Sequence, residues 1–285
     1  MVDRDSVAGR GTPPTVVRDD EARSHGLASR IQALKRAGGA LPPWAYHDAG
    51  FLEREKERIF ASGWVCAGRA DTLKETGDYL VTAIADEPVI VVRTDADTIR
   101  AFSNVCRHRM SLLLEGRGNV SRIVCPYHAW TYDLDGRLRG APLMEAAEGF
   151  HADAICLPSI RCECWQGWLL LSLDQSIPAP GETFAEVAEL VNDWGMAGYV
   201  ESFREEMGWH GNWKQVAENF MESYHLPVCH AGTVGRAVNL RQLAITELRD
   251  GFNYHRIVSD GSNPLTVAHA TNQRLSGEQR RTTWV

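Results

Sequence analysis

The sequence contains no apolar run long enough to cross a membrane and no excess of basic residues. A membrane-spanning helix requires about 20 consecutive apolar residues, and no stretch of the 285 residues approaches this length. The first forty residues are charged, rich in Gly and Pro, and without the apolar segment of an export signal. Lys and Arg total 30 against 37 for Asp and Glu, a formal net charge of −7, which disfavours a nucleic-acid partner. These absences predict a cytoplasmic protein that binds neither membrane nor nucleic acid.

Cysteine is present, but in a number that does not suit a disulfide scaffold. Seven cysteines in a long chain without an export signal favour metal-binding or buried-thiol roles. The hydrophobic fraction of 44% is sufficient for a real core, and the sequence contains no internal repeat. The spacing of cysteine and histidine is therefore the most informative feature to trace.

Changes in composition divide the chain into four segments. Residues 1–40 are predicted to be a mobile, disordered tail. Residues 41–62 are predicted to form an N-terminal helix that packs on a catalytic domain. Residues 63–175 carry short β-branched runs separated by turn residues, which predict a small antiparallel β domain. A Pro/Gly-rich break then begins residues 176–285, which mix helical and strand patterns.

Periodicity places the individual elements. Helices are predicted at about 47–60, 184–194 and 212–225, and strands within 243–260. The last stretch, 272–285, completes no obvious helix or strand.

Two short motifs each pair one cysteine with one histidine: Cys106 with His108, and Cys125 with His128. A finger-type zinc site draws its cysteines from one loop and its histidines from another. Mixed pairs instead suit a [2Fe-2S] cluster in which the cysteines hold one iron and the histidines the other. Both motifs follow predicted strands, so two hairpin tips can face each other across the cluster. A zinc site and four unconnected side chains are the alternatives.

This pattern resembles the Rieske iron-sulfur domain of the oxygenase type. Arg109 and Trp130, which flank the motifs, match that type. Met110 and Ala129 stand where the family more often has glycine, which bears on the tightness of the loops.

The clamp disulfide of respiratory Rieske proteins has no counterpart, because its positions hold Ser111 and Tyr127. Without the clamp, and with fewer expected hydrogen bonds to the sulfurs, the resemblance implies a low potential within the Rieske range of roughly −150 to +300 mV. Such a centre suits electrons received from a reduced flavoprotein or ferredoxin.

The other five cysteines indicate no second cluster. Cys162 and Cys164 have no partner motif nearby, and we interpret them as positions on one strand rather than a metal or redox pair. Cys66, Cys156 and Cys229 are interpreted as small buried or half-buried side chains.

A second histidine pair lies in the sequence "ENFMESYHLPVCH", residues 218–230. Asn212 is a suitable N-cap for the helix that precedes it. One helix face is predicted from apolar residues at helical spacing, namely Trp213, Val216, Ala217, Phe220, Met221 and Tyr224. Glu218, Glu222 and His225 fall on the opposite side, so a solvated polar face is the alternative to a metal site.

Two features favour the metal site. Glu222 and His225 are i, i+3 neighbours, so the carboxylate can bond one ring nitrogen and direct the other toward a metal. On an unbroken helix His230 would lie roughly 140° away from His225, but Pro227 forbids that helix. A turn after His225 is predicted to let both imidazoles reach one ion.

The segment 212–230 resembles the mononuclear-iron segment of the Rieske non-haem iron oxygenases, the aromatic-ring-hydroxylating alpha-subunit family. The resemblance implies that His225 and His230 are ligands of a 2-His-1-carboxylate Fe(II) site and that Asn219 lines it. It also implies that Glu222 bridges to a cluster histidine of a neighbouring subunit. Glutamate instead of the usual aspartate is similar to the branch that acts on quaternary amines such as carnitine.

The resemblance implies an α+β fold, with an antiparallel Rieske domain and an incomplete helix-grip catalytic domain. It implies a homotrimeric terminal oxygenase that uses O2 and electrons from NAD(P)H, delivered by a reductase or ferredoxin. The reaction would hydroxylate a small aromatic compound, or oxidatively demethylate or cleave a quaternary amine.

The third iron ligand is missing from the recognisable pattern. In the family this carboxylate comes far downstream, whereas only 55 residues follow His230, and Asp250, Asp260 and Glu278 are interpreted as surface charges. We therefore expect a C-terminally truncated chain that exposes apolar surface and lacks this ligand, which puts its activity in doubt. A Rieske-type electron carrier without mononuclear iron and a zinc-stabilised binding module are the rival predictions.

Overall fold

The computed structural model describes residues 41–144, 147–237, 239–245, 252–258 and 272–284. The tail predicted at 1–40 lies outside the described residues. The chain divides into two compact units: Met1–Glu55 with Trp209–Phe220, and Lys56–Gly208 with Met221–Val285.

The first unit joins the N-terminal helical segment to a helix from far along the chain. It contains η1 (Pro43–Tyr46), α3 (Ala49–Glu55) and α6 (Trp213–Phe220). Trp44 and Ala45 are buried, and Phe51 packs its ring edge-on against Trp44 at a centroid distance of 5.1 Å. The helix predicted over 47–60 thus exists, but its last turn is a π-helical turn, η2 (Lys56–Phe60), which belongs to the second unit.

The second unit is built on a seven-stranded antiparallel sheet with strand order β1-β10-β9-β4-β3-β2-β5. The strands are β1 (Val65–Arg69), β2 (Asp78–Ile84), β3 (Glu87–Arg93), β4 (Ile99–Ser103), β5 (Arg117–Asn119), β9 (Ser159–Trp165) and β10 (Trp168–Ser172). The predicted antiparallel β fold is confirmed.

Strand β3 shows why the sheet forms. Residues 89–92 are four successive β-branched side chains, all fully buried. Alternate side chains of a strand point to opposite faces, so Ile90 and Val92 enter one hydrophobic core and Val89 and Val91 another. A continuous apolar run is therefore required here rather than an alternating one.

Two tight hairpins fix the register of the sheet. Ala85 and Asp86 connect β2 to β3, and Gln166 and Gly167 connect β9 to β10. The backbone φ is +51° at Ala85, +50° at Gln166 and +81° at Gly167. Positive φ at these positions is what two-residue hairpin loops require.

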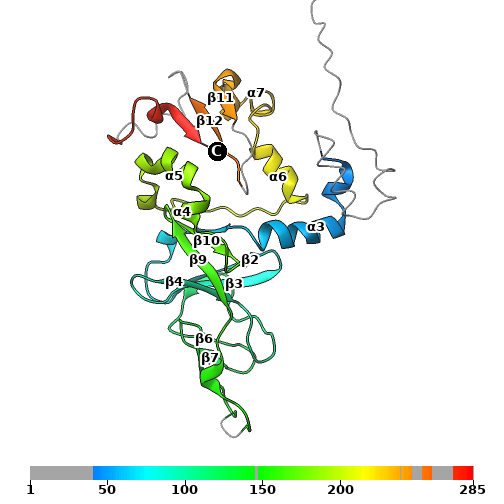
Figure 1. Ribbon diagram of the computed structural model, residues 1–285, viewed down its shortest axis with the longest axis vertical. Coiled ribbons are helices and arrows are strands. Elements are labelled where there is room, and N and C mark those ends of the chain that lie inside the picture. Colours follow the sequence, from blue (N-terminus) through cyan, green and yellow to red (C-terminus); the bar gives the residue numbers. More distant parts are fainter. Residues whose placement is uncertain (1–40, 145–146, 238, 246–251, 259–271, 285) are drawn as a thin grey trace, which may run out of the picture. The chain divides into compact units, whose positions relative to one another are not determined.

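A smaller sheet, of order β6-β7-β8, packs on the same core as Ile90 and Val92. Its strands are β6 (Ile123–Val124), β7 (Thr131–Tyr132) and β8 (Leu138–Gly140). Figure 1 shows β6 and β7 beyond one side of the β2–β4 region. Both candidate cluster loops lie around this core.

The region after the β strands is helical and then returns to a sheet. The predicted Pro/Gly-rich break already contains α4 (Pro180–Thr183), and the helix predicted at 184–194 is present as α5 (Ala185–Val191) and η5 (Asn192–Trp194). The remaining elements are η3 (Ala70–Thr72), η4 (Ala152–Ala154), η6 (Met196–Gly198), α7 (Leu226–Cys229), η7 (Val234–Ala237), η8 (Leu240–Gln242), β11 (Leu243–Ile245), β12 (His255–Val258), η10 (Gln279–Arg281) and β13 (Thr282–Trp284).

The strands predicted within 243–260 are confirmed as β11 and β12, and these pair in the order β11-β12-β13. The prediction that 272–285 closes no element is wrong, because β13 pairs antiparallel with β12. This strand is only three residues long, too short to give a periodic signal.

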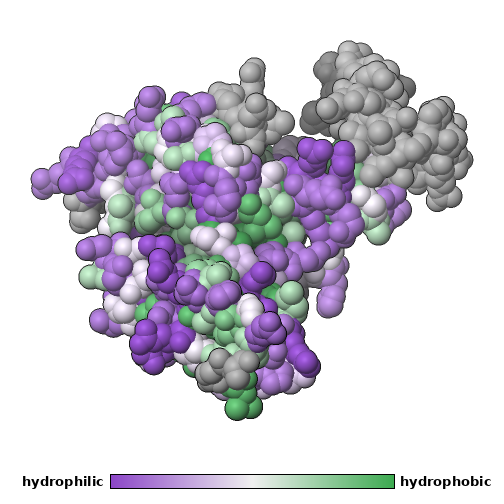
Figure 2. Space-filling view, turned by 60° about the horizontal axis from the view of Figure 1, so that its bottom comes forward, coloured by the Kyte–Doolittle hydropathy of each residue, from purple (hydrophilic) through white to green (hydrophobic). Residues whose placement is uncertain are grey.

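Apolar side chains are exposed at several places, as expected. Figure 2 shows apolar patches that interrupt the hydrophilic surface. Large exposed side chains after the β domain include Val200, Phe203, Met207, Trp209, Phe220, Tyr224 and Val228. Among the described helices, none combines the length and the apolar character needed to span a membrane.

Candidate metal centres

The first centre is formed by two loops that carry the predicted cluster ligands. One loop follows β4 and contains Cys106 and His108, and the other joins β6 to β7 and contains Cys125 and His128. Both thiols are buried, at 1% and 3% exposure, whereas His108 is half-buried and His128 is exposed. The two imidazole centroids are 4.7 Å apart. The structure thus brings the two motifs together, with sulfur inside and nitrogen toward the surface.

The two loops close in the same way despite their different spacing. In each, the cysteine N–H donates to the carbonyl five residues on, and its carbonyl accepts from the N–H four residues on. These bonds are Cys106 N to Ser111 O (2.9 Å), Met110 N to Cys106 O (3.1 Å), Cys125 N to Trp130 O (2.8 Å) and Ala129 N to Cys125 O (3.0 Å). The fourth residue after each cysteine has a left-handed backbone, with φ of +54° at Met110 and +56° at Ala129. This conformation explains why glycine suits these two positions.

Glycine at either position is expected to stabilise the protein. A left-handed backbone destabilises a residue with a side chain by about 1–2 kcal/mol. Glycine avoids this cost, but its greater freedom in the unfolded chain offsets about 0.5–1 kcal/mol of the gain. Met110→Gly and Ala129→Gly should therefore each raise the free energy of unfolding by up to about 1 kcal/mol, measured by urea unfolding. Ala83→Gly, on exposed β2 backbone of ordinary φ, should lower it. Equal losses in all three variants would show that the loops are unstrained.

The backbone around Cys125 favours its thiolate. Burial alone would raise the pKa of this thiol, but the N–H groups of His128 and Tyr127, with contacts from Cys106 and Ser111, lower the pKa below its ordinary value. A thiolate is the form that binds metals. The loop therefore favours the metal-binding form of this sulfur even without a metal.

Tyr132 is a contributor that the motif did not reveal. Its hydroxyl lies 3.4 Å from Cys106 Sγ and accepts the Arg107 N–H at 3.0 Å. Burial and the contact with Cys106 raise the pKa of this phenol, so it keeps its proton. The hydroxyl can thus donate to a Cys106 thiolate, which corrects the expectation of few hydrogen bonds to the sulfurs at this one ligand. In the sequence, only the presence of a tyrosine at a buried strand position could have suggested this role of Tyr132.

His108 carries the clearest sign that a group is to be bound. Its Nδ1 is buried and has no hydrogen-bond partner, and its ring stacks on Trp130 at 4.8 Å with an interplanar angle of 6°. Burial, with help from His128 and Arg109, lowers the pKa of His108 and keeps the imidazole neutral. A neutral, oriented ring with an unsatisfied nitrogen beside two buried thiols fits a metal cluster.

The five other cysteines do not join this centre. Cys162 and Cys164 both lie on β9, as predicted, and burial raises the pKa of Cys162 to about 12. The interpretation of Cys66, Cys156 and Cys229 as buried or half-buried is wrong, since all three are exposed. All seven thiols are free.

The second centre lies where α6 has ended. The helix predicted to reach residue 225 stops at Phe220, and α7 begins only at Leu226, with Pro227 in its first turn. The Glu222 carboxylate accepts the backbone N–H groups of Tyr224 and His225. These N–H groups are thereby satisfied outside a helix, so the turn precedes His225 instead of following it.

The predicted contact between Glu222 and His225 is present. Glu222 Oε1 bonds His225 Nδ1, which leaves Nε2 of the ring for another partner. The His225 and His230 centroids are 5.4 Å apart, at an interplanar angle of 66°. Desolvation opposes ionisation of Glu222, but the bonds from His225 and Tyr224 outweigh it and lower the carboxyl pKa. The turn thus presents an oriented histidine and a nearby second one.

A third ligand for this pair is not found in the described ranges, where no three His, Cys, Asp or Glu side chains converge on one ion. Asp250 and Asp260 lie outside the described residues. Glu278 is exposed and pairs with Arg256 at 3.4 Å, in agreement with a surface charge.

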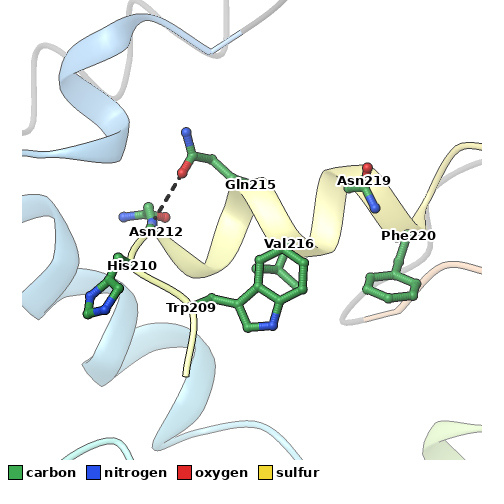
Figure 3. Close-up of a pocket in the computed structure, with 8 residues that line it drawn as sticks. Trp209, His210, Asn212, Gln215, Val216, Asn219 and Phe220 are labelled. Atoms are coloured by element: carbon green, nitrogen blue, oxygen red, sulfur yellow. Dashed lines mark hydrogen bonds between the residues drawn. The ribbon is translucent and has the colours of Figure 1, made fainter. Parts of the chain in front are cut away.

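Asn219, predicted to line the iron site, lies on α6 in the first unit. There it borders a pocket of about 260 Å³. Figure 3 shows Trp209, Val216 and Phe220 along one side of α6, with Gln215 and Asn219 on the other side. The place of Asn219 beside the histidines stays a prediction.

Two family models match separate parts of the chain. Residues 63–161 match the Rieske [2Fe-2S] domain, and residues 196–284 match the catalytic domain of the ring hydroxylating alpha subunit. The chain belongs to the Rieske oxygenase alpha-subunit family. Membership of this family implies a [2Fe-2S] cluster and a mononuclear iron.

Curated relatives of this Rieske oxygenase chain are oxygenase subunits rather than electron carriers. The carnitine monooxygenase oxygenase subunit of Escherichia coli (strain K12) is 32% identical over 214 residues, 72% of this chain and 56% of that protein. The glycine betaine monooxygenase oxygenase subunit of Chromohalobacter salexigens is 36% identical over 218 residues, 76% of this chain and 49% of that protein. The chain thus spans about half the length of these relatives.

Solved structures agree on the fold. A quaternary ammonium Rieske monooxygenase matches with a TM-score of 0.71 and 28% identity, over 78% of this chain and 62% of that one. The naphthalene 1,2-dioxygenase of Rhodococcus sp. matches with a TM-score of 0.71 and 22% identity, over 92% of this chain and 64% of that one. At that lower identity, the second likeness concerns the fold alone.

Proposed function

We propose that this chain is the oxygenase component, or a large part of it, of a Rieske-type monooxygenase that oxidises a small quaternary amine. The observation that carries the proposal is the presence of two metal-ready constellations in one chain. One is the Cys/His loop pair, with an unsatisfied His108 Nδ1, and the other is His225 oriented by Glu222 beside His230.

In the first constellation Cys106, Cys125, His108 and His128 would hold the [2Fe-2S] cluster. The backbone N–H groups of His128 and Tyr127 lower the pKa of Cys125, and the Tyr132 hydroxyl would donate to the Cys106 thiolate. Trp130 fixes the plane of His108. When bound, the cluster supplies single electrons, which we expect to originate from NAD(P)H and to arrive through a reductase or ferredoxin.

In the second constellation His225 and His230 would supply the two imidazole ligands of an Fe(II) that activates O2 when bound. Glu222 holds His225 in one tautomer and orientation, as partners of metal-bound histidines do. Its side chain is 41% exposed, so part of the carboxylate is accessible to an N–H from another chain. We propose that it accepts from an exposed cluster histidine of a neighbouring subunit in a homotrimer. Inter-subunit electron transfer is described for a solved quaternary ammonium monooxygenase related to this chain.

The substrate class follows from the bridge and the relatives. Glutamate at the bridging position is similar to the quaternary-amine branch, and the related carnitine, glycine betaine and choline monooxygenases act on quaternary amines. Hydroxylation of an aromatic compound is the second candidate, favoured by the match of residues 196–284 to the catalytic domain of the ring hydroxylating alpha subunit.

Iron counting and oxygen uptake test the proposal. Purified, iron-replete protein should contain about three irons per chain, and dithionite should produce the paramagnetic signal of a reduced Rieske cluster. With a reductase, carnitine, glycine betaine or choline should stimulate O2 uptake more than naphthalene does. About two irons per chain and no substrate-dependent uptake would favour the electron carrier instead.

Tyr132 offers a test of the cluster environment that does not depend on turnover. A hydrogen bond to sulfur stabilises the reduced, more negative cluster. Its loss, at about 1 kcal/mol, corresponds to roughly 40 mV for a one-electron couple. Tyr132→Phe should therefore lower the reduction potential by roughly this amount, measured by redox titration.

Tyr79→Phe is the matched control, because the Tyr79 hydroxyl donates to the Glu115 carbonyl and not to a cysteine. It should leave the potential unchanged. An unchanged potential in Tyr132→Phe as well would mean that the hydroxyl does not donate to the cluster.

A further inference from the structure

The first unit contains a buried ion pair outside both candidate metal centres. Lys214, in the first turn of α6, and Glu55, the last residue of α3, have side chains only 7% and 6% exposed. Lys214 Nζ donates to Glu55 Oε2 at 2.8 Å. Two charges removed from water need close compensation, because their desolvation is costly.

Aromatic rings supply part of this compensation. Lys214 Nζ lies 5.6 Å from the ring centroid of Tyr46 and 5.3 Å from those of Phe51 and Trp213. These distances are within the range of about 6 Å for cation–π attraction. Trp213 Nε1 also donates to Glu55 Oε2 at 3.1 Å. A carboxylate and three rings thus surround one ammonium group, and we call this arrangement the ammonium cage.

The most deeply buried side chain of α6 is the charged one at the centre of the cage. Lys214 is the buried residue of this helix, whereas Phe220, on the apolar face, is exposed. Two further links to the N-terminal segment are polar as well. Asn212 Nδ2 donates to the Tyr46 carbonyl at 3.0 Å, and the Tyr46 hydroxyl donates to Glu218 at 2.7 Å. The attachment of α6 to residues 41–55 is thus centred on a charge.

We propose that Lys214 is a positioning residue whose caged ammonium fixes α6 on the N-terminal segment. The helix carries Asn219 and leads along the chain directly into Glu222 and His225. The purpose of this anchoring rests on the proposed function, but the anchoring itself does not. The N-terminal segment, residues 41–55, is accordingly required to hold α6 in position.

Hydrogen exchange measured by mass spectrometry on the full chain tests the cage. In Lys214→Ala the unpaired Glu55 carboxylate is left buried, so amide exchange in peptides covering 49–55 and 213–220 should accelerate by at least about 100-fold. Exchange in the β2–β3 hairpin should not change. Lys56→Ala is the matched control: it breaks a pair of the same 2.8 Å length with Asp86, whose side chain is 77% exposed. It should change exchange in these peptides by less than about fivefold.

Chemical rescue separates the ammonium from simple filling of space. n-Propylammonium supplies the three carbons and the nitrogen that Lys214→Ala removes, and it should restore slow exchange in 213–220. 1-Propanol, which lacks the charge, should not. Rescue by both, or by neither, would overturn the proposal.

A second pair of variants covers the case in which Lys214→Ala does not fold. Lys214→Met keeps the length of the stem and loses the charge, and it should exchange rapidly in 213–220. Lys214→Arg keeps the charge and should stay within about tenfold of the parent protein. Exchange in Lys214→Met equal to that of the parent would overturn the proposal. The iron content of the parent protein tests the proposed function separately, so either result can fail without the other.

Discussion

Replacement of Cys125 by serine is expected to abolish the [2Fe-2S] cluster and the red-brown colour of the purified protein. Serine can keep the hydrogen bonds of the loop, but its hydroxyl does not ionise as a thiol does, and the cluster needs thiolate ligands. The N–H groups that lower the Cys125 pKa would then surround a neutral oxygen. The iron content should fall by about two per chain, and the signal of the dithionite-reduced protein should disappear. Absorption and paramagnetic resonance spectra measure both losses.

Cys164→Ser is the matched control, because Cys164 is an exposed thiol on β9 and belongs to neither candidate loop. It should keep full colour and iron content, and His108→Ala should lose both. A Cys125→Ser variant that kept its colour would remove this loop from the cluster. A colourless parent protein with bound zinc would instead establish the rival zinc-stabilised module.

The proximity of the two Cys/His motifs was predictable because the information is local. Each motif places a cysteine and a histidine within four residues, and the second motif lies in the loop that joins the paired strands β6 and β7. The left-handed backbone at Met110 and Ala129 could also be inferred, since a family preference for glycine at a position indicates that conformation. The contact of Tyr132 with the Cys106 sulfur could not be predicted, because the two residues are 26 positions apart and meet only in the folded core.

The helix at 212–225 shows where periodicity misleads. Its apolar spacing continues past Phe220, but the helix ends there, since the Glu222 side chain takes up the N–H groups of Tyr224 and His225. A stripe of apolar residues is ordinarily the buried face of a helix. The structure instead buries Lys214, because its partner, residues 41–55, offers a carboxylate and aromatic rings. Neither partner can be found from α6 alone.

Removal of the His225 imidazole is expected to eliminate the mononuclear iron and to leave the cluster intact. His225→Ala deletes one of two neighbouring imidazoles, so the iron content should fall from about three to about two per chain. Glu222→Gln keeps the imidazole but weakens the bond that orients it, and should lower Fe(II) affinity about 10–100-fold. Because the Glu222 pKa is lowered, its hold on His225 should persist as the pH falls through the ordinary carboxyl range and fail only below its own pKa. Fe(II) titration at several pH values measures each effect.

His151→Ala provides the matched control, because His151 is an exposed histidine outside both centres. It should leave three irons and an unchanged cluster spectrum. The graded order, with Glu222→Gln between the parent protein and His225→Ala, is what a metal ligand with an orienting carboxylate predicts. A solvated polar face predicts instead that iron content is the same in all four proteins, because none of these side chains would then touch a metal. Equal iron content in the parent protein and His225→Ala would thus show that the second centre is a surface turn that binds no iron. The cluster would then account for the iron of the chain.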